Sequence, residues 1–175
     1  MNVPPCCFTG YPPGVSRTGR DPAIKSRFGL EIKTDIPIER VRPGDYAALA
    51  VPGGFHSHGF NEAYDDRLKE LATGIHGAGG WIATFCVGIL PVAEAGLLEG
   101  RKAVSYPYSR NHDNLARLKE LGASVATDQV VIDDRIISCA GPAASLEVAW
   151  QLLEGLIGKA HCAEVKRLMC VRSPD

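Results

Sequence analysis

One cysteine of this chain lies where its thiol could act as a nucleophile. Residues 81–85 form a short apolar run after two glycines, as in a buried strand of a parallel sheet, and residues 89–98 repeat apolar side chains at helical spacing. Cys86 therefore falls at a strand-to-helix turn, where Gly88 leaves room for a tight bend. Free N–H groups and the helix dipole lower a thiol pKa at such a turn, so we expect a thiolate nucleophile. The alternative is that Cys86 is a small buried hydrophobe.

A glycine loop is expected beside this cysteine. Residues 45–51 predict a second parallel strand, and it ends in Pro-Gly-Gly-Phe at 52–55. The carboxyl ends of parallel strands meet at one edge of the sheet, where ligands bind in open α/β folds. Gly54 and the backbone N–H of Val87 could therefore form an oxyanion hole facing Cys86.

The remaining pattern predicts alternating strands and helices. The expected strands are 15–19, 24–28 and 30–33 as a small hairpin, 45–51, 81–85, 102–106, and 129–132 with 135–139 as a second hairpin. The expected helices are 61–78 with Asn61 as its N-cap, one after Cys86, one from 111 or 113 to 122, 142–157 and 163–169. We therefore expect an irregular, proline-rich segment at 1–14 and a single doubly wound α/β domain over 15–175.

Composition sets the class of protein. The 175 residues are 45% apolar, which suffices for one domain with a real core, and a net charge of −1 argues against a general nucleic-acid or membrane-surface binder. The sequence has neither an apolar run of membrane-spanning length nor a signal-peptide pattern, so we expect a cytoplasmic protein. Its six cysteines lack paired zinc-site spacing, and reduced thiols are expected.

Five motifs occur in a characteristic order. They are Gly-Arg-Asp-Pro at 19–22, Val-Pro-Gly-Gly-Phe at 51–55, Phe-Cys-Val-Gly at 85–88, Ala-Gly-Leu-Leu-Glu-Gly-Arg-Lys-Ala at 95–103 and Cys-Ala-Gly-Pro-Ala-Ala-Ser at 139–145. Together they resemble the ThiJ/PfpI family of the class I glutamine amidotransferase-like superfamily, over roughly residues 15–170. The resemblance implies a flavodoxin-like sandwich with a mostly parallel sheet, commonly a homodimer. It also implies that Cys86 is the reactive cysteine, with Gly54 and Val87 as backbone donors to a substrate carbonyl.

The resemblance leaves several functions open. Members of the family include amidases or peptidases, glyoxalase-type lyases, hydratases and redox sensors. Peptidase-like members often carry His directly after the nucleophile, where this chain has Val87, so a peptidase is not expected. We expect a cysteine-dependent hydrolase or lyase acting on a small carbonyl or amide compound. The alternatives are a non-catalytic redox or stress-response protein with an oxidisable cysteine, or an inactive paralogue.

The beginning of the chain departs from the family pattern. The family usually opens with an apolar strand and a loop whose carboxylic acid hydrogen-bonds the cysteine. Residues 1–14 are too short and too rich in proline to supply both, and no Asp or Glu precedes Asp21. We therefore expect an atypical or truncated N-terminus that lacks this acid.

Other side chains could carry the proton in place of that acid. His56 and His58 follow the glycine loop, Tyr106 ends the expected strand 102–106, and His112 follows a little later. His56 and His58 could also suggest a metal pair, but spacing indicates no further ligands. We expect no metal and no cofactor, with His56, His58 or Tyr106 as the candidate proton carrier for Cys86.

Overall fold

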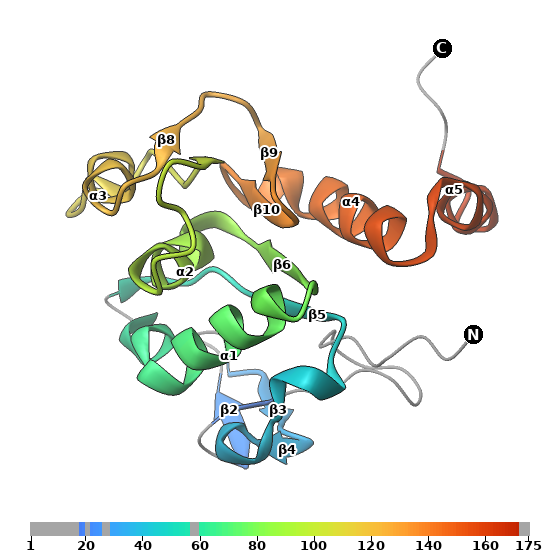
Figure 1. The fold of residues 1–175 in the computed structure, drawn as a ribbon, viewed down its shortest axis with the longest axis horizontal. Helices are drawn as coiled ribbons and strands as arrows, with labels where there is room; N and C mark the ends of the chain where they lie inside the picture. Colours follow the sequence, from blue (N-terminus) through green and yellow to red (C-terminus); the bar gives the residue numbers. More distant parts are fainter. Residues whose placement is uncertain (1–17, 20–21, 26–28, 57–59, 172–175) are drawn as a thin grey trace.

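A mostly parallel sheet lies at the centre of the computed structural model, which describes residues 18–19, 22–25, 29–56 and 60–171. Among these residues the largest sheet has the strand order β5-β6-β10-β9 (Figure 1). The first three strands are mutually parallel, and β9 runs antiparallel to β10. Their bounds are Ala48–Val51 for β5, Trp81–Thr84 for β6, Ile136–Cys139 for β10 and Val130–Asp133 for β9. This arrangement confirms the expected doubly wound, flavodoxin-like fold.

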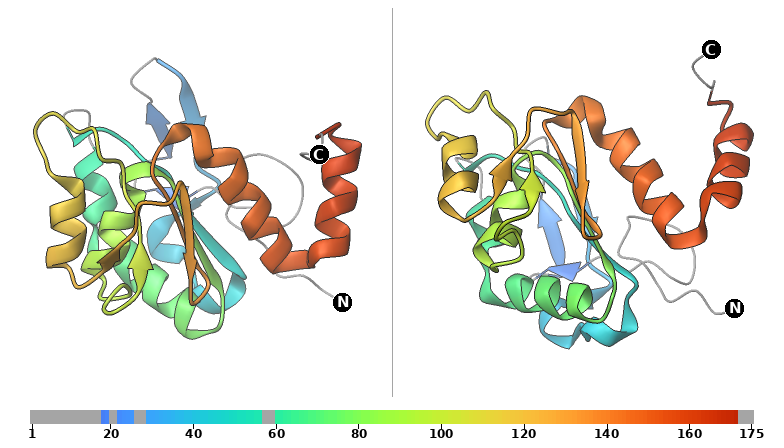
Figure 2. Two further views of the ribbon diagram at one scale, coloured as in Figure 1. Left: turned by 90° about the horizontal axis from the view of Figure 1, so that it is seen from above. Right: turned by 45° about the horizontal axis from the view of Figure 1, so that its top comes forward.

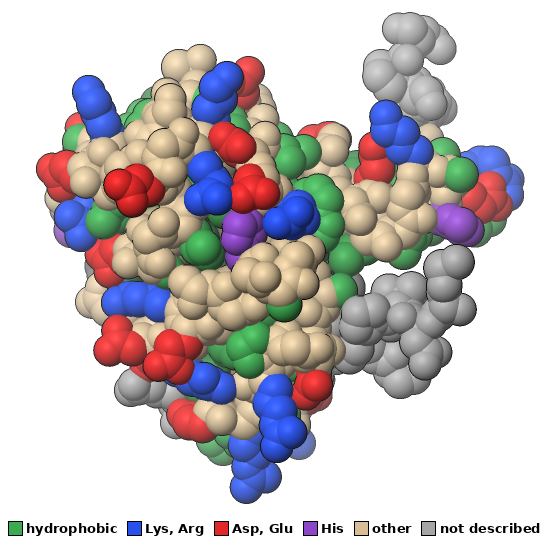
Figure 3. Space-filling view, in the orientation of Figure 1, with side chains coloured by type: hydrophobic (Ala, Val, Ile, Leu, Met, Phe, Trp, Pro, Cys, Tyr) green, Lys and Arg blue, Asp and Glu red, His purple; other side chains and the backbone are tan. Residues whose placement is uncertain are grey.

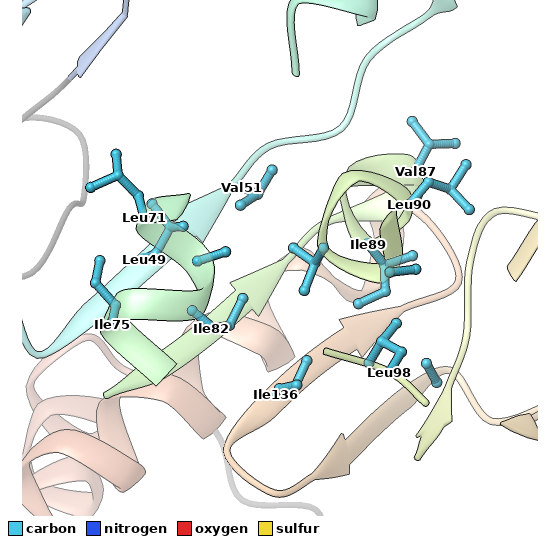
Figure 4. Close-up of a cluster of buried hydrophobic side chains, with 14 of the residues drawn as sticks. Leu49, Val51, Leu71, Ile75, Ile82, Val87, Ile89, Leu90, Leu98 and Ile136 are labelled. Atoms are coloured by element: carbon cyan, nitrogen blue, oxygen red, sulfur yellow. The ribbon is translucent and has the colours of Figure 1, made fainter. Parts of the chain in front are cut away.

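Helices cover both faces of this sheet (Figure 2). Helices α1 (Asp66–Gly77) and α2 (Ile89–Glu94) pack on one face, and α4 (Ser145–Ile157) packs on the other. Figure 4 shows how apolar side chains from β5, α1, β6, α2 and β10 meet in the first of these two layers. Burying them stabilises the fold and holds the carboxyl ends of β5, β6 and β10 at one edge.

Shorter elements surround this core. The β2–β3 antiparallel pair lies where the sequence predicts a small hairpin, and β1 and β7 each pair with a parallel partner. The strands are β1 (Thr18–Gly19), β2 (Ala23–Lys25), β3 (Glu31–Lys33), β4 (Ile36–Pro37), β7 (Lys102–Ala103) and β8 (Ser124–Val125). The remaining helices are α3 (Asn114–Glu120) and α5 (Lys159–Leu168). Helix α5 stands away from the sheet and packs against α4 (Figures 1 and 2).

Three local predictions need comment. The predicted cap Asn61 is wrong: a 3₁₀ segment spans residues 60–64, and helix α1 is capped by Asp65, whose Oδ1 accepts the N–H of Arg67 at 2.7 Å. Expected strand 102–106 pairs only at Lys102–Ala103. The predicted irregular segment at 1–14 lies outside the described residues.

In the part of the chain that is described, no helix combines the length and apolarity needed to cross a membrane.

Candidate active site

Cys86 occupies a sharp turn between β6 and α2. Phe85 is still extended, Cys86 has a φ of 58°, and a single 3₁₀ turn over Cys86–Gly88 leads into the helix. A residue with a side chain rarely adopts this left-handed conformation, which costs on the order of 1–3 kcal/mol and must be held by its surroundings. The strand, turn and helix predicted from the sequence are all present, and the half-buried Cys86 lies beyond the end of the strand.

Close backbone packing holds this turn in place. A Cβ atom on Gly53 would lie 2.8 Å from Cβ of Cys86, and one on Gly88 would lie 2.5 Å from the carbonyl oxygen of Val51. Both positions therefore require glycine for the loop after β5 to contact the turn. Gly54, which the sequence places in the site, packs against the Phe60 ring. A Cβ atom built on Gly54 would lie 2.6 Å from that ring. The role of the Gly54 N–H as an oxyanion donor stays a prediction.

The Cys86 thiol is less acidic than the sequence predicts. Burial raises its pKa, a hydrogen bond from the backbone N–H of Val87 lowers it, and the nearby Cys139 raises it again; the net shift is upward. The predicted lowering is wrong because packing around the turn removes water from the thiol, and burial is the largest effect on its pKa. The predicted role of the Val87 N–H toward a substrate oxygen stays untested.

The segment after β7 borders the same edge of the sheet. The hydroxyl of Ser105, which is fully buried, donates to the carbonyl oxygen of Cys86 at 3.3 Å. The Tyr106 ring lies against Gly141, and a Cβ atom built on Gly141 would lie 3.4 Å from it. The carbonyl oxygen of Tyr106 accepts a hydrogen bond from the side-chain amide of Asn114 at 2.8 Å. Tyr106 is thus at the predicted edge, and a proton-carrying role for its hydroxyl stays a prediction.

His56 belongs to a cavity beside α2. Its Nε2 lies 3.1 Å from the Tyr64 hydroxyl, and its ring centroid lies 4.7 Å from that of His112. The cavity holds about 670 Å³ and is lined by His56, Asn61, Tyr64, Leu90, Glu94, Asn111, His112, Asp113, Asn114, Ala116, Arg117 and Glu120. His58 lies outside the described residues. The structure therefore joins the loop after β5 to the segment before α3, which are far apart in the sequence.

Burial and charge set the protonation of this cavity. Burial, and then the proximity of His112, lower the pKa of His56, which favours a neutral imidazole able to accept a proton. Burial and the Glu94 carboxylate raise the pKa of Tyr64 to about 12, against the opposing effect of Arg117. Arg117 pairs with Glu94 at 3.0 Å. The sequence offered no local pattern for Tyr64, Glu94 or Arg117, because their association is tertiary.

The described residues contain no cluster of three or more His, Cys, Asp or Glu side chains arranged to hold a metal ion.

A mostly parallel sheet with helices on both faces, and a cysteine in a left-handed turn at its carboxyl edge, define a flavodoxin-like protein with a cysteine at a strand-to-helix turn. The model of the DJ-1/PfpI family matches residues 14–155. The chain belongs to this family, as its motifs predict.

Relatives and solved structures agree with this assignment. Protein DJ-1alpha of Drosophila melanogaster is 29% identical over 83% of this chain and 65% of its own length. Deglycase PH1704 of Pyrococcus horikoshii is 27% identical over 65% of this chain and 67% of its own length. The glutathione-independent glyoxalase DJR-1.2 of Caenorhabditis elegans is 24% identical over 85% of this chain and 75% of its own length. A ThiJ/PfpI family protein from Pseudomonas syringae superposes with a TM-score of 0.74 at 26% identity, over 92% of this chain and 64% of that one. The chain thus spans about two thirds of the length of these first relatives.

Proposed function

We propose that this protein is a cysteine-dependent enzyme acting on a small carbonyl or amide compound, with Cys86 as its nucleophile. The observation that carries the proposal is the left-handed turn at Cys86, which close contact with Gly53 keeps in a costly conformation. Relatives named deglycase and glyoxalase favour carbonyl chemistry over amide hydrolysis.

The simplest substrate for such a site is a 1,2-dicarbonyl compound. The Cys86 sulfur would add to an aldehyde carbon, and the resulting oxyanion would be met by backbone N–H groups, for which Gly54 and Val87 are the candidates. Proton transfer between the two carbons, followed by addition of water to release the sulfur, converts glyoxal and water into glycolic acid. No external oxidant or reductant is consumed in this conversion.

This chemistry requires a base. Because burial raises the Cys86 pKa, little thiolate exists at neutral pH, and a neighbouring group must accept the thiol proton as substrate binds. His56, whose pKa is lowered in the cavity beside α2, is the first candidate, and His58 and Tyr106 are the others. Cys86 is not among the residues that line this cavity, so His56 would have to reach the thiol as substrate binds.

Glyoxal turnover tests the proposed activity. We expect the wild-type chain to form glycolate, measured by proton NMR, and Cys86→Ser to lose this activity entirely. Cys170→Ser is the matched control, because Cys170 is an exposed cysteine near the chain end and should be dispensable. Equal turnover by Cys86→Ser and wild type would exclude Cys86 as the nucleophile; no turnover by either, with amides also inert, would favour the inactive paralogue.

A histidine comparison tests the proposed base. His56→Ala should lower glyoxal turnover by about 10²-fold or more, as loss of a general base does, while leaving the rate of Cys86 alkylation at high pH unchanged. His161→Ala is the control, since His161 is exposed on α5. Wild-type turnover by His56→Ala would assign the proton to another group.

A further inference from the structure

Buried polar side chains are concentrated at one short segment, which follows β7 and lies beside the cysteine turn. The described residues have five buried polar side chains, namely His76, Thr84, Ser105, Asn114 and Ser138. The last three form hydrogen bonds with the backbone of residues 104–106 or of Cys86. Buried polar groups add little net stability, but once all are bonded they hold a single arrangement. Their concentration here therefore indicates a segment that is held in one position.

This segment is held from both sides, although it belongs to no strand. The N–H of Val104 donates to Oγ of Ser138, on β10, at 3.1 Å. The carbonyl oxygen of Tyr106 accepts a hydrogen bond from the side-chain amide of Asn114, the first residue of α3, at 2.8 Å. The sheet and a helix thus take the place of strand pairing, and Ser105 lies between the two fixed points.

Ser105 connects the segment to the cysteine turn. Its hydroxyl is fully buried and donates to the carbonyl oxygen of Cys86 at 3.3 Å. That carbonyl and the N–H of Val87 belong to one planar peptide unit, so fixing the direction of the oxygen also fixes the direction of the N–H. The Val87 N–H is in turn hydrogen-bonded to Cys86 and lowers the pKa of its thiol, against the larger effect of burial.

We propose that Ser105 is a positioning residue for Cys86, which fixes the peptide unit between Cys86 and Val87 so that the Val87 N–H faces the sulfur. Because Ser105 is fully buried, it acts through the turn and not on the substrate. The left-handed conformation of Cys86 requires such support, since it is costly for a residue with a side chain. The inference rests on the proposed function, in which the same N–H is a candidate donor to the oxyanion.

Alkylation of Cys86 across a range of pH tests the proposal. Ser105→Ala removes only the hydroxyl, so the Val87 N–H is no longer held at the sulfur and the thiolate loses a hydrogen bond. We expect reaction with iodoacetamide near neutral pH to be about tenfold slower than in wild type, as for loss of a hydrogen bond to a charged group. The limiting rate at high pH should be unchanged. Cys139, which also acts on the thiol, is the same in every variant.

Thr84→Val is the matched control. Thr84 is fully buried, and its hydroxyl also donates to a backbone carbonyl, that of Ile137 at 2.9 Å, but this carbonyl belongs to β10 and not to the turn. The variant should lose stability in urea without moving the pH profile of Cys86 alkylation. Ser105→Thr, which keeps the hydroxyl, should retain the wild-type profile. A wild-type profile in Ser105→Ala, an equal shift in Thr84→Val, or faster alkylation of Ser105→Ala at every pH would overturn the proposal.

Nuclear magnetic resonance of the wild type gives a second measurement, which decides the matter if Ser105→Ala does not fold as judged by circular dichroism. The chemical shift of the Val87 amide proton should change with pH at the same midpoint as Cys86 alkylation, and this change should be absent in Cys86→Ser. A Val87 amide that does not respond to ionisation of Cys86 would overturn the proposal. Glyoxal turnover is measured separately, so a chain that is inactive on glyoxal but shows these effects would contradict the proposed enzyme alone.

Discussion

At the scale of single residues, the position of Cys86 follows from the sequence but its acidity does not. A short apolar run, a cysteine and a helical repeat suffice to place it in a turn between strand and helix. Its pKa depends on how closely Gly53 and the segment around Ser105 pack against it, which no local pattern records. The same limit explains why the contacts of His56 with Tyr64 and His112 could not be predicted.

The pH dependence of alkylation tests the acidity of Cys86. Because burial raises the pKa, we expect folded protein to react with iodoacetamide at Cys86 more slowly than denatured protein near neutral pH, with the rate rising only at alkaline pH. The same shift contributes stability that is complete below the unfolded-state pKa and is lost as pH rises through the folded-state pKa. Peptide mapping isolates Cys86, with Cys86→Ser as the blank. Faster reaction of the folded chain at neutral pH would contradict this.

At the scale of elements, the lengths of helices and strands are harder to predict than their order. Apolar residues at helical spacing predict α1, α3 and α4, because each helix buries one face against a neighbouring element. The start of α1 was misplaced since Asn61 and Asp65 are both good caps, and only tertiary packing selects Asp65. Packing also allows α4 to approach the sheet closely, with Gly155 directly over the Trp81 ring.

Two glycine substitutions separate packing from helix propensity. Gly155→Ala should destabilise the fold by about 1–3 kcal/mol, because its methyl group would overlap the Trp81 ring. Gly77→Ala is the matched control: Gly77 is the last residue of α1 and nothing lies within 4 Å of a Cβ added there, so the variant should gain at most about 0.5 kcal/mol. Urea denaturation measures both free energies of unfolding. Equal effects of the two substitutions would mean that α4 does not contact Trp81 this closely.

At the scale of the whole molecule, the family and fold class followed from five motifs in order, whereas the adjacency of β6 and β10 required the structure. Figure 3 shows acidic and basic side chains interspersed on the face in view, in keeping with a net charge of −1. The single domain over 15–175, the cytoplasmic location and the homodimer stay predictions.

Light scattering coupled to size-exclusion chromatography tests the homodimer. The family resemblance leads us to expect a particle of twice the mass of the chain, stable on dilution and equal for wild type and Cys86→Ser. A mass equal to one chain at all concentrations would contradict this expectation.

The pairing of β6 with β10 also has a consequence for how the protein folds. Ala83 and Ile137 are more than fifty residues apart, with α2, α3 and the β7–β8 pair between them. Contacts of such long sequence separation form slowly, because closing the intervening loop costs chain entropy before the strand pairing contributes stability. During synthesis, β6 must therefore leave the ribosome with one edge still unpaired. Cys86 would remain more open to modification in the nascent chain than in the finished protein.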